Sequence, residues 1–128
     1  MEVNIMIIVR ITMNVLPEKQ KEMEQTLISM IWLMKQAAGC RSYVILSDVE
    51  NINLLNLIGE WRTRKDLDNH LKSEIFSIFL GTKSLLKEPL GIHIYTVIKS
   101  EGMEAVTEAR WKENDSAMAV ISKLLPEY

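Results

Sequence analysis

The N-terminal segment carries the pattern that most restricts how this chain can fold. Along an extended backbone, residues 3–13 place every second side chain on one side, and that side is wholly apolar. The opposite side is polar at its ends but apolar in its middle, at Met6 and Ile8. Strict alternation predicts a β-strand, and apolar residues on both sides predict that both sides are buried.

The apolar patterns further along the chain alternate between strand and helix. A proline in the first turn and a glycine just past the last turn delimit the first predicted helix. Thr63, followed three residues later by Asp66, is a capping signal for the second helix, and Pro89 stops it. The predicted segments after the first strand are a helix at 17–38, strands at 41–47 and 54–61, a helix from 63 to about 86 with Gly81 as a candidate break, and a strand at 92–99.

This β-α-β-β-α-β order predicts an α+β, ferredoxin-like fold with an antiparallel four-stranded sheet. We expect residues 1–100 to form that domain. Residues 101–128 are predicted to be a helical C-terminal extension, with helices in "MEAVTEARWKEN" and "DSAMAVISKLL". The length of 128 residues suits one domain with its own hydrophobic core.

Two helices can cover one face of such a sheet, so the other face needs a second cover. That face is partly apolar in the first strand and also in the third, where Leu54 and Ile58 share a side opposite Leu55 and Leu57. Burying each such side chain contributes about 1.5–3 kcal/mol. We therefore expect a homodimer or a higher homo-oligomer, with a second copy of the chain on this face; the alternative is that the C-terminal helices fold back over it.

Composition limits the partners and the compartment. The net charge is −2 and the chain has no basic block, which argues against nucleic acid as a partner. Cys40 is the single cysteine, so no internal disulfide can form, as is usual in a reducing compartment. No apolar run approaches the ~20 residues of a membrane span. We expect a cytoplasmic protein that does not bind membranes.

Several signals at fixed spacing lie around the second and third predicted strands and the second predicted helix. They are Gly39-Cys40, the turn from Asp48 to Asn53, Glu60-Trp61, and Leu67, His70, Ser73 and Phe76. With these signals, the region from about Ile5 to Ile98 resembles the antibiotic biosynthesis monooxygenase family.

The resemblance implies a dimeric α/β barrel with a pocket between sheet and helices in each protomer. The family includes cofactor-free oxygenases of anthrones and quinols, haem-degrading enzymes and proteins without known activity. The sequence departs from the haem-degrading branch at Leu80, where an iron-ligating histidine would lie, and at Val9, where a pocket asparagine would lie. Leu57 replaces an asparagine of the best-understood anthrone oxygenases.

Four residues are the candidates for the site. His70 is the candidate catalytic residue, because a neutral imidazole can take a proton from a phenol or enol near pH 7. Its structural alternative is a pairing with Glu74 or with a strand carbonyl. Trp61 could form a wall for an aromatic substrate, and Tyr43 and Asn56 could donate hydrogen bonds to it. The alternative for Trp61 is a role in the core or interface.

Together these observations predict a cofactor-independent monooxygenase of a small aromatic or quinol-like molecule. We expect no cofactor and no metal site, since the two histidines, His70 and His93, show no ligand spacing. The alternative function is a non-catalytic, small-molecule-binding protein of the same fold.

Overall fold

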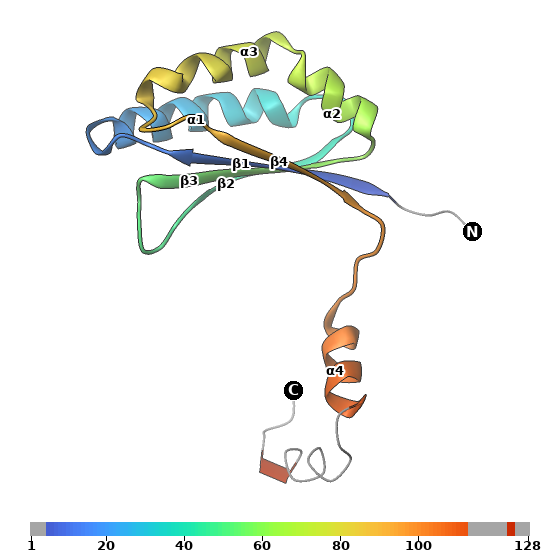
Figure 1. Ribbon diagram of the computed structural model, residues 1–128. Helices are drawn as coiled ribbons and strands as arrows, with labels where there is room; N and C mark the ends of the chain where they lie inside the picture. The colour runs from blue at the N-terminus through green and yellow to red at the C-terminus, as the bar shows by residue number, and fades with distance from the viewer. Residues whose placement is uncertain (1–4, 113–122, 125–128) are drawn as a thin grey trace. The chain divides into compact units, whose positions relative to one another are not determined.

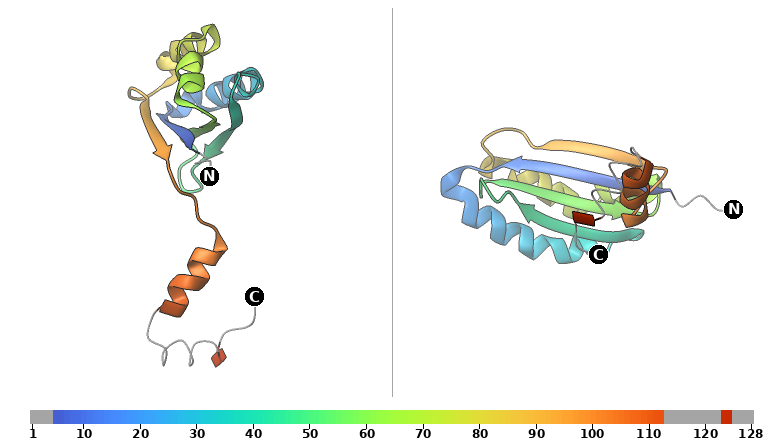
Figure 2. Two further views of the ribbon diagram at one scale, coloured as in Figure 1. Left: turned by 90° about the vertical axis from the view of Figure 1, so that its right-hand side faces the viewer. Right: turned by 90° about the horizontal axis from the view of Figure 1, so that it is seen from below.

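The computed structural model describes residues 5–112 and 123–124 of the chain, and its contacts group the chain into two units, Met1–Ile98 and Lys99–Tyr128. The first unit is a two-layer structure with a sheet on one side and all of its helices on the other (Figures 1 and 2). The sheet is antiparallel, in the order β2-β3-β1-β4, which confirms the predicted α+β, ferredoxin-like fold. Its strands are β1 (Met6–Asn14), β2 (Cys40–Ser47), β3 (Leu54–Trp61) and β4 (Gly91–Val97).

The hydrophobic core lies between this sheet and the helices. β1 contributes every second residue, Ile7, Val9, Ile11 and Met13, as its alternation predicts. The helix α1 (Gln20–Lys35) buries methionine and leucine side chains three or four positions apart, which is the spacing of one helix face. They are Met23, Leu27, Met30 and Met34.

The first helix is shorter than predicted. It starts as a 3₁₀ turn, η1 (Pro17–Lys19), and its α-helical part ends at Lys35 rather than at residue 38. Gly39 adopts the left-handed conformation, with φ of 81°, and an added Cβ there would overlap the side chain of Asp66. The chain therefore turns at a position where only glycine avoids both strain and a clash.

The predicted helix from residue 63 to about 86 is divided at Gly81, which was the candidate break, and also at Ser73, where no break was predicted. The segment forms α2 (Arg64–Leu71), α3 (Glu74–Leu80) and the 3₁₀ helix η2 (Gly81–Leu85). Ser73 has an extended backbone, and its hydroxyl accepts a hydrogen bond from the Phe76 amide at 3.2 Å. This N-cap starts a new helix and interrupts the helical layer between α2 and α3.

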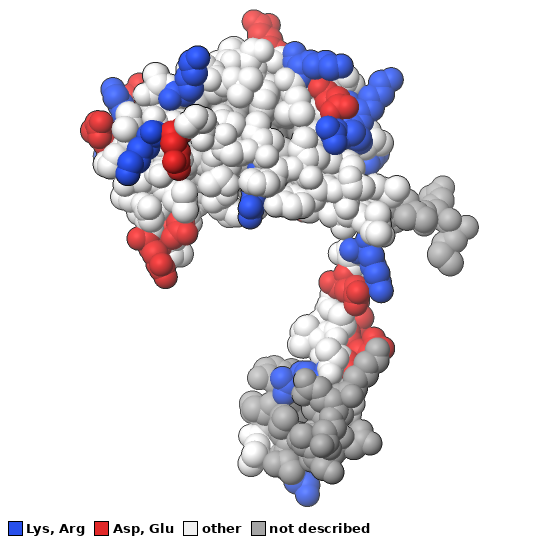
Figure 3. Space-filling view, viewed as in Figure 1, with Lys and Arg blue, Asp and Glu red and all other residues white. Residues whose placement is uncertain are grey.

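The face of the sheet opposite the helices carries both apolar and polar side chains. Strand register places Ile8 beside Tyr95 and Arg10 beside both Ile58 and His93 on this face. Val44, on β2, is 42% exposed and Tyr95 is 44% exposed, so in this subunit the face is only partly covered. In Figure 3, charged side chains gather towards the two ends of the sheet-and-helix unit, and the surface between them is mostly uncharged.

The second unit contains α4 (Met103–Lys112), at the position of the first predicted tail helix. The second predicted tail helix lies outside the described residues, apart from Lys123 and Leu124. Among the helices of the described part of the chain, none has the length and apolar character needed to cross a bilayer.

Candidate functional site

Four aromatic side chains meet between the sheet and the second and third helices. Trp61 and His70 stack with ring centroids 4.7 Å apart and planes inclined by 27°. Tyr43 approaches both rings edge-on, at 5.4 Å from His70 and 6.0 Å from Trp61. Phe76 packs against the imidazole in a T-shaped arrangement, with ring centroids 5.1 Å apart. We call these residues, Tyr43, Trp61, His70 and Phe76, the Trp61–His70 cluster.

The third strand positions the indole. Trp61 is the last residue of β3, and alternation places it on the helix-covered side with Leu57 and Gly59. An added Cβ on Gly59 would lie 2.9 Å from Trp61 Nε1, with Tyr43 Cε1 at 3.2 Å. The missing side chain of Gly59 is therefore what lets both aromatic rings pack over the sheet at this point.

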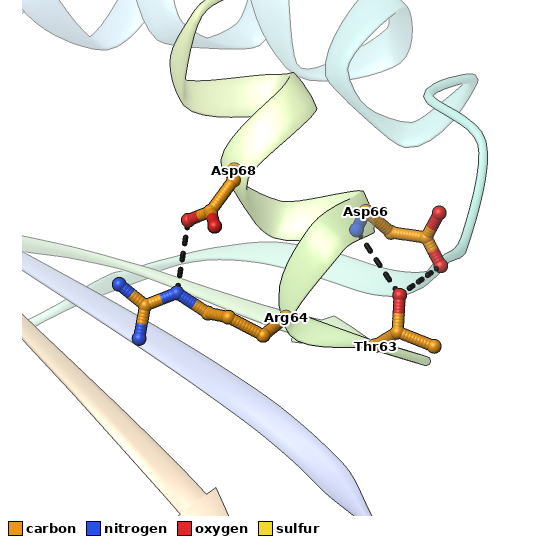
Figure 4. Close-up of polar contacts among 4 residues, drawn as sticks. All are labelled: Thr63, Arg64, Asp66 and Asp68. Atoms are coloured by element: carbon orange, nitrogen blue, oxygen red, sulfur yellow. Dashed lines mark hydrogen bonds and ion pairs between the residues drawn. The ribbon is translucent and has the colours of Figure 1, made fainter.

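The start of α2 positions the imidazole. Thr63 accepts a hydrogen bond from the Asp66 amide at 3.1 Å and donates one to the Asp66 carboxylate at 2.8 Å (Figure 4). Arg64 bonds Asp68 one turn later at 2.9 Å (Figure 4). This confirms the predicted cap at Thr63, and it fixes where α2 begins and hence where its buried residues, Leu67 and His70, face the sheet.

Within the described residues, the His70 side chain has one polar partner. Its Nε2 lies 3.2 Å from the Tyr43 hydroxyl, in a buried hydrogen bond between α2 and β2. The two structural alternatives, a pairing with Glu74 or with a strand carbonyl, are therefore not what the structure shows. The contact to Tyr43 was not predicted, because two residues 27 positions apart on different elements leave no trace in local spacing.

Burial keeps both partners of this hydrogen bond neutral at pH 7. Desolvation lowers the pKa of His70 to about 4, because a charged imidazolium is unfavourable in this apolar setting. Desolvation also raises the pKa of Tyr43 well above its ordinary value, with a smaller contribution from the neighbouring Cys40. No charged side chain is among the causes of the His70 shift.

Two polar atoms of the cluster have no hydrogen-bond partner within the described chain. They are Trp61 Nε1 and His70 Nδ1, and both are fully buried. The two rings that carry these atoms stack, with their centroids 4.7 Å apart. Buried groups of this kind are rare in folded proteins, and each costs about 1–3 kcal/mol when unpaired.

The structure brings together His70, Trp61 and Tyr43 but not Asn56. Asn56 lies on the opposite face of the sheet, where its side chain accepts a hydrogen bond from Thr12 at 3.0 Å. His93 and Tyr95 stack on that same face, with centroids 6.4 Å apart, and do not approach the cluster. Within residues 5–112 and 123–124, no three His, Cys, Asp or Glu side chains come close enough to bind a metal.

Residue patterns do not assign Gly59 and Phe76 to the site. Gly59 is typical of a weak point inside a strand, and Phe76 appears only as the last of the spaced signals on which the resemblance rests. The signal for Gly59 is its position two residues before Trp61, on the same side of the strand.

An open depression of about 230 Å³ lies at the outer edge of β2. Tyr43 lines it, as do Lys35, Cys40 and Arg41. Burial raises the pKa of the Cys40 thiol, so this cysteine is not activated as a nucleophile. The depression therefore places open space beside one member of the cluster without offering reactive groups of its own.

Comparison with known proteins agrees with this fold. A conserved protein from Methanosarcina mazei Go1 is 30% identical, with a TM-score of 0.68 over 72% of this chain and 92% of its own. Rv0793 from Mycobacterium tuberculosis is 21% identical, with a TM-score of 0.70 over 76% of this chain and 99% of its own. PA3566 from Pseudomonas aeruginosa is 22% identical, with a TM-score of 0.66 over 79% of this chain and 100% of its own.

Among curated proteins, none matches the chain significantly. The profile of the antibiotic biosynthesis monooxygenases, in contrast, matches residues 6–80, which hold β1 to α3 and every member of the Trp61–His70 cluster. The chain belongs to the antibiotic biosynthesis monooxygenase family.

Proposed function

We propose that the protein is a cofactor-independent monooxygenase of a small aromatic or quinol-like molecule, with the Trp61–His70 cluster as its reaction site. The observation that carries the proposal is the state of His70. Its Nε2 is held by Tyr43, while Nδ1 is buried and without a protein partner. A substrate oxygen that binds at Nδ1 meets an imidazole whose orientation is already fixed, beside the indole of Trp61.

The proposed chemistry needs an electron-rich substrate anion and O₂. The enol form of an anthrone-like substrate loses its O–H proton to solvent as it binds, and the resulting anion transfers one electron to O₂. The radical pair then combines into a C–O bond at the ring carbon that still carries one hydrogen, and the peroxide takes up a proton to give a hydroperoxide. Loss of the remaining C–H proton with cleavage of the O–O bond leaves a carbonyl on carbon and releases one oxygen atom as water.

The protein contributes orientation and a dry site in this scheme. Trp61 and Tyr43 are 0% exposed and His70 is 3% exposed, so the cluster excludes water. Low polarity strengthens each hydrogen bond to a developing anion. For a substrate to enter, part of the helical layer has to move, and the interruption between α2 and α3 at Ser73 is where we expect that movement.

We further propose that a second copy of the chain covers the open face of the sheet. The partly exposed Val44, Leu46 and Tyr95 on that face support the proposal. Family membership supports it as well, since it implies a dimeric barrel. A dimer buries these side chains and also shields the sheet beneath the reaction site from solvent.

Oxygen uptake tests the proposed activity. We expect the protein to consume O₂ with an anthrone, forming one quinone and one water per O₂, and His70→Ala to lose this activity. His93→Ala, at the other histidine of the chain, serves as the control and keeps it. The absence of uptake above the spontaneous rate across anthrones and hydroquinones contradicts the proposal.

A second candidate function is ligand binding without oxygen chemistry. The specific observation in its favour is that the pKa of His70 is lowered to about 4, which makes it a weak base at neutral pH. Its signature is an increase in melting temperature with an aromatic ligand that is recovered unchanged. Turnover of the same ligand under O₂ rules it out.

A further inference from the structure

We infer that His70 carries its proton on Nδ1 in the resting protein, and that this N–H and the Trp61 indole N–H form a two-donor site for a ligand oxygen that accepts hydrogen bonds. The ligand class is then an aromatic ketone, a quinone or an ionised phenol, rather than a neutral hydrocarbon. The inference deepens the proposed function, because it assigns the atoms that contact the substrate, but its first part concerns the protein alone.

The argument starts from the Tyr43 hydroxyl. Its side chain is 0% exposed, and within the described chain its one hydrogen-bond partner is His70 Nε2. A buried hydroxyl proton without an acceptor costs about 1–3 kcal/mol. The Tyr43 O–H therefore donates to Nε2, and Nε2 must have its lone pair free to accept it.

A neutral imidazole has one N–H, so an accepting Nε2 places the hydrogen on Nδ1. Burial keeps the ring neutral at pH 7. In the opposite tautomer, Nε2 donates to the tyrosine oxygen. The Tyr43 proton, the Nδ1 lone pair and the Trp61 N–H are then all unpaired, whereas the first arrangement leaves two unpaired groups, both N–H donors. The count of unpaired groups favours Nδ1–H.

Two unpaired donors on stacked rings define the complementary ligand. Each needs an acceptor, and a carbonyl or phenolate oxygen offers several lone pairs in a small volume. An ionised oxygen accepts stronger hydrogen bonds than a neutral one. Within the proposed reaction, His70 then acts as a donor that stabilises the substrate anion, and not as the base that removes its proton; Tyr43 is a positioning residue that sets the tautomer.

The tautomer is measurable without any ligand. Long-range ¹H–¹⁵N spectra distinguish Nδ1–H from Nε2–H, and the exposed His93 provides an internal reference. We expect His70 to show the Nδ1–H pattern at pH 7, and Tyr43→Phe to shift it towards Nε2–H. An Nε2–H pattern in the wild-type protein overturns the inference, as does a pattern that Tyr43→Phe leaves unchanged.

The ligand class is tested with 1-indanone and indane, which share a skeleton and differ by one carbonyl. We expect 1-indanone to move the Trp61 and His70 N–H resonances downfield and indane to move neither. The exposed indoles of Trp32 and Trp111 are the controls. Equal effects of the two compounds, or no effect of the ketone, overturn the two-donor site.

These measurements separate the inference from the proposed function. Ketone binding with an Nδ1–H tautomer but without O₂ uptake from any anthrone supports the inference and contradicts the monooxygenase. O₂ uptake in a protein whose His70 is the Nε2–H tautomer supports the monooxygenase and contradicts the inference.

Discussion

The Tyr43 hydroxyl and His70 Nε2 form a buried hydrogen bond of 3.2 Å that links the edge strand β2 to the helix α2. It is the one polar contact of the imidazole within the described chain, and it leaves Nδ1 free for a ligand. The indole of Trp61 and the ring of Phe76 pack against the imidazole and help to keep the pair dry. The arrangement fixes a histidine without giving it a charge.

Acid should destabilise the protein through His70. The pKa of this residue is about 4 in the folded protein and 6.5 in an unfolded chain. Between these values the unfolded state binds the proton more tightly, so the free energy of unfolding is highest above about pH 6.5 and falls as the pH drops towards 4. At about 1.4 kcal/mol per pH unit over about 2.5 units, the loss is at most about 3–4 kcal/mol.

Urea unfolding at pH 7.5 and pH 5 measures this loss. His70→Gln stays neutral at both pH values, so we expect it to reduce the difference, while His93→Gln keeps the wild-type difference. If the unfolding free energy of His70→Gln differs between the two pH values as much as that of the wild-type protein, His70 is not the source of the acid sensitivity.

Gly59→Ala should displace the indole of Trp61. The new methyl group would lie 2.9 Å from Trp61 Nε1 and 3.1 Å from a Val9 methyl group, so the rings must shift. We expect a loss of stability of about 1–3 kcal/mol, as for other overpacked cores, and a change in the near-ultraviolet spectrum of the aromatic rings.

Gly81→Ala is the matched control, because no atom lies within 4 Å of the added Cβ and the backbone there is helical. We expect this variant to be as stable as the wild-type protein or slightly more stable. Equal losses of stability in the two variants would show that the close contacts above Gly59 do not cause the loss.

Arg10→Glu should weaken the proposed dimer. Arg10 and Glu60 lie diagonally across β1 and β3 on the open face, and neither is in an ion pair within the described chain. In a two-fold dimer each can pair with the opposite charge of the second copy. Sedimentation velocity should show that Arg10→Glu dissociates at higher protein concentrations than the wild-type protein. The double variant Arg10→Glu/Glu60→Arg should regain the wild-type dimer.

A monomeric wild-type protein at micromolar concentration would contradict the dimer itself. A double variant as weak as the single one would leave the dimer in place but exclude this pairing. The pair of variants thus tests the interface and its charges separately.

Ser73→Ala should loosen the junction between α2 and α3. The Ser73 hydroxyl caps α3 and donates to the His70 carbonyl at 2.6 Å, so its loss should cost about 1 kcal/mol. Ser77→Ala, which removes an exposed bond to the Ser73 carbonyl at 3.2 Å, is the control, and we expect a smaller change. Thermal unfolding and amide exchange of Phe76 measure both.

Local patterns predict the layers of this fold but not the contacts of its site. Alternation in β1 identifies the buried side of the sheet, and Thr63 with Asp66 identifies where α2 begins. The break at Ser73 was missed because the apolar spacing of Leu67, Leu71 and Ile75 continues through it. The Tyr43–His70 bond depends on tertiary packing, and alternation could not tell that Asn56 faces away from it.

The hydroxyl of Ser73 joins two helices that carry two rings of one cluster. It bonds the main chain of His70 on one side and of Phe76 on the other. A ligand that displaces one of these rings therefore also strains the hydrogen bond that holds the other. Ligand entry should be cooperative, so that the imidazole and the phenyl ring move together rather than one after the other.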